Sequence, residues 1–145
     1  SISVSFFPIF SSIDQKNKTR LNLLKKYLIL LIIMGLAFFS LTFVFADYII
    51  IFLFGSKFSS ASETLKLFSF VLPLTAISNA LGRQWLMAKN KDLYYSISLS
   101  ISSIIALIFF IFFVKTIGIN AFPISLIIFE SLSIIIISYF LFAND

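Results

Sequence analysis

Two long stretches without a charged residue constrain the fold of this chain more than any other feature. Residues 27–46 and residues 93–114 contain no Asp, Glu, Lys or Arg. Because an α-helix rises about 1.5 Å per residue, each stretch is long enough to cross the hydrocarbon core of a bilayer, which is about 30 Å thick. The sequence therefore predicts an all-α membrane protein, a polytopic bundle of transmembrane helices.

The overall composition supports the same class. Of the 145 residues, 60% are hydrophobic and 12% are charged, and the mean hydropathy is +1.09. Soluble domains contain about 45–50% apolar and about 25% charged residues. A chain of this length cannot bury that much apolar surface in a globular core, so we expect it to contact lipid.

Four full spans are predicted, at about residues 27–46, 67–88, 93–114 and 119–142, within a four-helix transmembrane segment of residues 27–145. Residues 1–10 are interpreted as the end of a truncated transmembrane helix of a larger protein, and residues 11–26 as a basic cytoplasmic loop. Residues 49–54 are expected to continue the first helix up to Gly55, and residues 56–66 to form a polar exterior loop. Residues 96–103 alternate like a barrel strand, but residues 104–114 are apolar on both faces, which favours a helix.

The distribution of cations predicts the orientation. Short cytoplasmic loops carry an excess of Lys and Arg, and Trp85 stands beside a Lys-bearing turn, as expected at a membrane boundary. Lys57, Lys66 and Lys115 are then the exterior cations, and both ends of the fragment are cytoplasmic. The cytoplasmic topology determinants are Lys16, Lys18, Arg20, Lys25, Lys26, Lys89 and Lys91.

The sequence argues against several function classes. It has no Cys and no His, which excludes disulfides, zinc sites of the common types and His general bases. The net charge of +5 is placed at the ends of apolar runs rather than on a basic face, so nucleic acid is not an expected partner. No nucleophile stands beside a base and no Gly-rich phosphate loop is present. Enzymatic activity, a metal and a cofactor are therefore not expected.

Glu130 is the sharpest functional candidate, because it lies near the middle of the last span. A carboxylate at that depth costs several kcal/mol unless it pairs, faces water or takes a proton, and such residues tend to mark transport pathways. Glu130 is interpreted either as a contact for substrate, proton or cation in a central cavity, or as a hydrogen-bonded residue that only fixes helix packing. The sequence leaves both open.

Further polar residues of the spans add candidates for the substrate or ion pathway. Arg83 lies about one turn from a helix end, where it can extend its charge to the headgroups, and this explanation is favoured over binding of an anionic phosphate. Asn79 and Gln84 could line a polar cavity or bond across helices. Pro73 and Pro123 are predicted as helix kinks, either hinges or static bends. Ser96, Ser100 and Ser103 share a helix face and are predicted to pack against another helix.

Several of these segments together resemble the C-terminal third of the O-antigen flippases, the Wzx-type exporters of lipid-linked oligosaccharides. The matching features are Phe7-Pro8 before a basic loop, Leu53-Phe54-Gly55 after the next span, and the helix end from Gln84 to Lys91. The last matched span shows Gly118, Ala121 and Glu130 in a pattern of that family. Phe122-Pro123 departs from it, since small Ala-rich residues often stand there.

The resemblance implies a function and a set of partners. The whole protein would flip an undecaprenyl-pyrophosphate-linked O-antigen unit across the bacterial inner membrane by alternating access. Membrane lipids would surround it, and polysaccharide polymerase and ligase components would be further partners in lipopolysaccharide biosynthesis. Of the family's cavity residues, only Glu130 is carried over. The alternatives are a multidrug exporter of the same superfamily, a non-transporting membrane subunit, and a membrane-embedded glycosyltransferase or polymerase, for which the exterior loops are short.

Overall fold

A computed structural model describes the backbone of residues 18–86 and 91–143, with side chains from residue 25 onward except those of residues 84, 85 and 142. The described chain is helical and contains no β-strand. The elements in order are α2 (Lys18–Phe54), a 3-10 turn (Ser56–Phe58), α3 (Ala61–Ser69), α4 (Val71–Asn79), a π-helical segment η2 (Ala80–Leu86), α5 (Asp92–Ile117), a second 3-10 turn η4 (Gly118–Asn120) and α6 (Ala121–Phe142).

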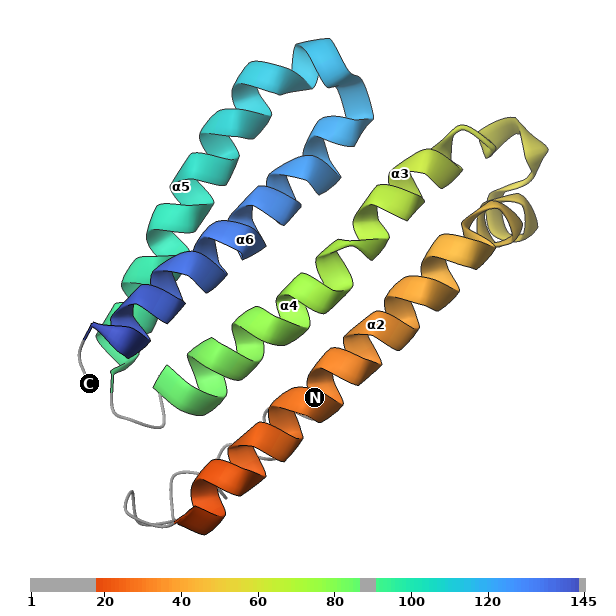
Figure 1. The fold of residues 1–145 in the computed structure, drawn as a ribbon. Coiled ribbons are helices and arrows are strands. Elements are labelled where there is room, and N and C mark those ends of the chain that lie inside the picture. Colours follow the sequence, from red (N-terminus) through yellow and green to blue (C-terminus); the bar gives the residue numbers. More distant parts are fainter. Residues whose placement is uncertain (1–17, 87–90, 144–145) are drawn as a thin grey trace.

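The helices lie side by side in a row rather than around a common centre (Figure 1). α5 and α6 form an antiparallel hairpin, and α6 packs on its other side against α4. α3 continues the line of α4, and both pack against α2. α4 and its extension η2 therefore lie between α2 and the α5–α6 hairpin, and they carry most of the polar residues discussed below.

Three helical segments of the described chain are long and apolar enough to cross a membrane: Lys25–Phe54, Ala61–Arg83 and Asp92–Leu141. The predicted count of four spans is not matched, because the third segment runs without a break through α5, η4 and α6. Its direction nevertheless reverses at Gly118, which has a positive φ of 66° that glycine adopts without a steric penalty. The apolar helices are compatible with a multi-pass membrane protein.

The first helix is longer than predicted. α2 begins at Lys18, inside the predicted basic loop, and continues through Asp47 to Phe54. Lys, Arg and Leu are all good helix formers and no Pro or Gly interrupts this segment before Gly35, which explains the early start. α2 ends before Gly55, as expected, where a φ of 86° terminates it. The predicted truncated helix at residues 1–10 lies outside the described residues.

The second span is built from several pieces. The predicted exterior loop at residues 56–66 instead contains a 3-10 turn and the start of α3, whose first turn carries Glu63 where the helix dipole favours an acid. The α-helix is interrupted at Phe70, three residues before Pro73. Pro73 has no N–H to donate to the carbonyl of Ser69, which is a physical reason for an interruption at this point. Phe70 packs there between Phe39 and Phe43 of α2, with ring centroids 4.9 and 6.0 Å away.

Small residues form the helix contacts, and large apolar residues point outward. Ser98, Ser102 and Ala106 of α5 are buried in the hairpin, as are Ala121, Ser125 and Ser133 of α6. By contrast, Phe52 and Phe112 are 88% and 74% exposed. Close approach through small side chains, with bulky apolar ones outside, is the packing expected in lipid.

The packing of α5 against α6 contradicts one prediction from the sequence. Ser96, Ser100 and Ser103 are exposed and do not form the packing face of α5. The buried face is that of Ser98 and Ser102, which follows the same 3–4 residue spacing. Serines occur on both sides of this part of α5, so the spacing alone does not identify the packed face.

Gly35 sets the distance between α2 and α4. A Cβ atom at this position would lie 3.0 Å from the Cα of Pro73 and 3.1 Å from the Cβ of Ala76. The two helices therefore approach each other at backbone distance, next to the break in the second span. A change in the position of α4 near Pro73 would therefore alter its close contact with Gly35 of α2.

Candidate polar site between α4 and α6

Glu130 lies in the middle of α6 and is buried, with 7% of its surface exposed. Two hydroxyl groups of α4 donate to its carboxyl group. The Thr75 hydroxyl donates to Oε1 at 2.8 Å, and the Ser78 hydroxyl donates to Oε2 at 2.5 Å. Both carboxyl oxygens therefore have a partner from the neighbouring helix.

These two bonds explain how the carboxyl group is tolerated in an apolar helix. An acidic side chain at the centre of a membrane helix costs about 2.5–3.5 kcal/mol on insertion scales, and it faces the protein interior for this reason. Thr75 and Ser78 are three residues apart, so they lie on the same face of α4. Their spacing and the position of Glu130 fix the register of α4 against α6.

The end of α4 widens into the π-helical segment η2. Short π-helical segments within helices are rare and occur often at functional sites. Gly82, in this segment, is buried against the ring of Tyr95 from α5. A Cβ atom at Gly82 would come within 2.2 Å of that ring, so the absence of a side chain allows Tyr95 to approach the η2 backbone.

Arg83, the residue after Gly82, is exposed at this helix end. Tyr95 is half-buried and packs against the cluster of Leu86, Ile137 and Leu141.

The remaining predicted pathway residues are less closely associated with Glu130. Asn79 is half-buried, and its side-chain amide donates to the backbone carbonyl of Thr75 at 2.8 Å, four residues earlier in the same helix. The side chain of Gln84 lies outside the described residues. Pro123 is buried in the first turn of α6, where its missing N–H breaks no helical hydrogen bond, and α6 runs unbroken from Ala121. Pro123 thus stands at the start of a helix.

The predicted topology determinants differ in how much is described. Lys25 and Lys26 are exposed on α2, and Lys91 is the residue before α5. Lys18 and Arg20 belong to α2, but their side chains are not described. Lys16 and Lys89 lie outside the described residues.

A polar network joins the helices at the opposite end of the row. Lys66 of α3 forms an ion pair of 2.8 Å with Asp47 of α2. The Thr64 hydroxyl donates to the Asn120 side chain at 2.6 Å, which ties α3 to the turn between α5 and α6. This end is therefore cross-linked by side chains from three parts of the chain.

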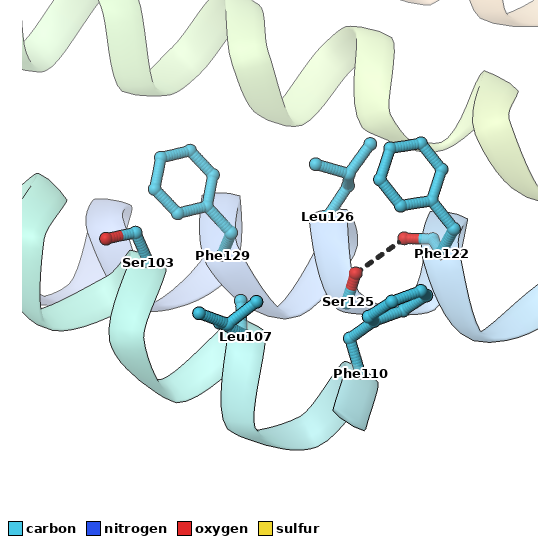
Figure 2. A pocket seen from close by; sticks show the side chains of 8 residues that line it. Ser103, Leu107, Phe110, Phe122, Ser125, Leu126 and Phe129 are labelled. Carbon is cyan, nitrogen blue, oxygen red and sulfur yellow. Dashed lines mark hydrogen bonds between the residues drawn. The ribbon is translucent and has the colours of Figure 1, made fainter. Parts of the chain in front are cut away.

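A shallow groove of about 420 Å³ lies between α5 and α6 and is lined almost entirely by apolar side chains, including Leu107, Phe110 and Phe129 (Figure 2). The hydroxyl of Ser125, at its edge, donates to the carbonyl of Phe122 (Figure 2). Another groove, of about 250 Å³, lies between α2 and α4 and includes Thr75 and Asn79. No group of His, Cys, Asp or Glu among the described residues could hold a metal ion.

Sequence reasoning identified Glu130 but not its partners. Nothing in the sequence distinguishes Thr75 and Ser78 from the other polar residues of their span. Their helical spacing alone does not reveal which neighbour they face. The α4–α6 pairing was needed to bring Thr75 and Ser78 to Glu130.

Comparisons with known proteins do not assign the chain to a family: no family model, no curated protein and no solved structure matches it.

The bonds of Glu130 predict a measurable coupling between α4 and α6. We expect Ser78→Ala and Glu130→Gln each to lower the stability of the detergent-solubilised protein, by about 1–3 kcal/mol, because a buried polar group loses its partner. The double variant should be less destabilised than the sum of the two, since each removes the same interaction. Thermal unfolding of the four proteins measures this coupling. Ser96→Ala, on the exposed face of α5, is the matched control, and strict additivity of the two main changes would contradict the bond.

Proposed function

We propose that this chain is part of a transporter that flips a lipid-linked O-antigen or polysaccharide repeat unit across the bacterial inner membrane. The observation that carries the proposal is the buried Glu130, held in the middle of an apolar helix by hydroxyl groups of a neighbouring helix that is broken and partly π-helical. Intramembrane acids that face other helices mark pathways for substrates or ions.

The shape of the second span supports movement in this region. The α-helix is interrupted at Phe70, close to Pro73, and changes to π-helix at Ala80. Interrupted helices near a polar residue are common at the binding sites of secondary transporters, where one part of the protein rocks against another. Glu130 would bias this movement by bonding α4 to α6 in one arrangement and releasing it in the other.

The substrate is proposed from the resemblance of the sequence to O-antigen flippases, and it is an undecaprenyl-pyrophosphate-linked oligosaccharide. The apolar outer surfaces of the helices are suited to the lipid part of such a molecule, because they are already adapted to hydrocarbon. Polysaccharide polymerase and ligase components are the proposed partners, since they would use the flipped unit.

We also propose that α5 and α6 each cross the membrane, which gives four spans. α5 has 26 residues and α6 has 22, so each is long enough by itself. The reversal at Gly118 returns the chain to the side from which α5 started (Figure 1). With the cation-rich end in the cytoplasm, the Gly118–Asn120 turn faces the periplasm.

The absence of cysteine from the sequence allows this topology to be tested with single-cysteine variants. We expect Lys57→Cys and Lys115→Cys to react with a membrane-impermeant maleimide in intact cells. Lys26→Cys and Ala143→Cys should react only after the membrane is permeabilised. All four positions are exposed, so access to the reagent depends on the membrane side alone. Labelling of positions 115 and 143 from the same side would contradict separate crossings by α5 and α6.

The transport function itself predicts a defect in surface polysaccharide. Deletion of the full-length gene in its host should remove the O-antigen ladder of lipopolysaccharide on a gel, and the wild-type gene should restore it. Glu130→Gln should restore it poorly at equal abundance in the membrane, because the amide cannot accept both hydroxyl bonds or carry a charge. The Ser96→Ala variant, exposed on α5, should restore it fully. An unchanged ladder in the deletion strain would contradict the O-antigen proposal.

One observation favours a second function, a non-transporting membrane subunit. Both oxygens of Glu130 are already bonded within the protein, as they would be in a residue that only fixes helix packing. In that case Glu130→Gln should reduce membrane abundance and polysaccharide export in equal proportion. Quantitative immunoblotting beside the gel separates the two functions.

A further inference from the structure

Glu130 has hydrogen-bond donors but no ion-pair partner among the described side chains. Its carboxyl oxygens accept from Thr75 and Ser78 of α4, and α4 contains no Lys or Arg. The Lys66–Asp47 ion pair lies at one end of the row of helices and does not involve it. Acceptance at both oxygens is typical of an ionised carboxyl group, and an ionised group in an apolar interior is unfavourable without a compensating charge. The two hydroxyl bonds therefore leave the charge of Glu130 uncompensated.

Two buried hydroxyl groups of the neighbouring helix surfaces have no hydrogen-bond partner. Ser102 of α5 and Ser133 of α6 are both 0% exposed, and neither hydroxyl forms a hydrogen bond within the described part of the chain. By contrast, the hydroxyls of Ser98 and Ser125 donate to carbonyls of their own helices. Because Ser133 follows Glu130 by three residues, the two side chains are neighbours on the surface of α6.

The register of the α5–α6 hairpin places Ser102 at the same depth. Two ring pairs join these helices, Tyr94 with Phe140 and Phe110 with Phe122, with ring centroids 4.8 and 6.1 Å apart. Ser102 is halfway between the two rings of α5, and the halfway point between the two rings of α6 is the residue after Glu130. Since α5 and α6 are antiparallel (Figure 1), the carboxyl group and the two unpartnered hydroxyls lie at one level of the row.

The oxygen atoms at this level suit a small monovalent cation. Carboxylate and hydroxyl oxygens are ligands that hard metal cations prefer. A hydroxyl that donates its proton to a carboxylate keeps its lone pairs, so it can contact a cation at the same time. One carboxylate balances one positive charge, whereas no group of acidic residues suited to a metal ion is found among the described residues. Thr75 also lines the groove between α2 and α4, so the site borders the surface of the bundle.

We propose that Glu130, Thr75 and Ser78 bind a Na⁺ ion between α4 and α6, and that the hydroxyls of Ser133 and Ser102 complete its ligands. The ion supplies the positive charge that the described side chains do not give to Glu130. Close packing through small side chains favours Na⁺ over the larger K⁺. The ion joins three helices at one level, and this role is the same in a transporter and in a structural subunit.

Thermal unfolding of the full chain in detergent tests this proposal. The salt is varied from choline chloride to NaCl or KCl at constant ionic strength, so that general screening does not change. A ligand that binds only the folded state raises Tm with its concentration. We expect Tm to rise with Na⁺ to a greater extent than with K⁺, and choline to have no such effect. Equilibrium binding of radioactive Na⁺ to the same protein measures the affinity directly.

Serine variants identify the ligands. Ser133→Ala and Ser102→Ala should each lower the affinity for Na⁺ by about tenfold or more, because one polar contact to a charged group is lost. Glu130→Gln should remove the dependence on Na⁺. Ser125→Ala is the matched control and should leave the affinity unchanged, since Ser125 is a buried serine of α6 whose hydroxyl bonds within its own helix. If Glu130→Gln does not fold, the serine variants still decide the question.

Three results would overturn the proposal. The first is an equal Tm of the wild type in Na⁺, K⁺ and choline. The second is a Tm that rises as the pH falls and does not respond to Na⁺, which would show that a proton neutralises Glu130. The third is a higher Tm of both Ser133→Ala and Ser102→Ala, equal in Na⁺ and in choline, as expected when a methyl group replaces a buried hydroxyl that binds nothing.

Discussion

The burial of one carboxyl group determines how the central helices of this protein fit together. Glu130 cannot remain without hydrogen-bond donors in the middle of an apolar helix, because the surrounding lipid supplies none. Thr75 and Ser78 supply both, and they do so from one face of α4. The pairing of α4 with α6, its register and the inward orientation of this part of α4 all follow from that requirement.

Shape restricts the other contacts of the row. Serine and alanine join α5 to α6, and Gly35 brings α2 to backbone distance from Pro73. At one end, the Lys66–Asp47 pair and the Thr64–Asn120 bond connect three parts of the chain.

The sequence predicts features that depend on a local run or a single residue type. It does not predict features that depend on which helices pack against each other. Uncharged runs of membrane length predict α2 and α5, and Pro73 predicts the break near Phe70. The predicted packing face of α5 was wrong. Serines occupy both sides of this helix, and only the position of α6 determines that Ser98 and Ser102 are the buried ones. The contact of Gly82 with the Tyr95 ring depends on the position of α5, and the partners of Glu130 depend on α4. Neither contact leaves a local pattern in the sequence.

The most direct test of the α4–α6 pairing is a cross-linking measurement in the membrane. Cysteines are introduced at Ser78 and Glu130 in the otherwise cysteine-free chain, with a protease site in the loop between η2 and α5, and a short bifunctional thiol reagent is added. The account predicts that the two fragments remain linked after cleavage. The pair at Leu72 and Glu130 should link poorly, because Leu72 is on the exposed face of α4. Efficient linking of the second pair but not of the first would contradict the arrangement in which Glu130 faces α4.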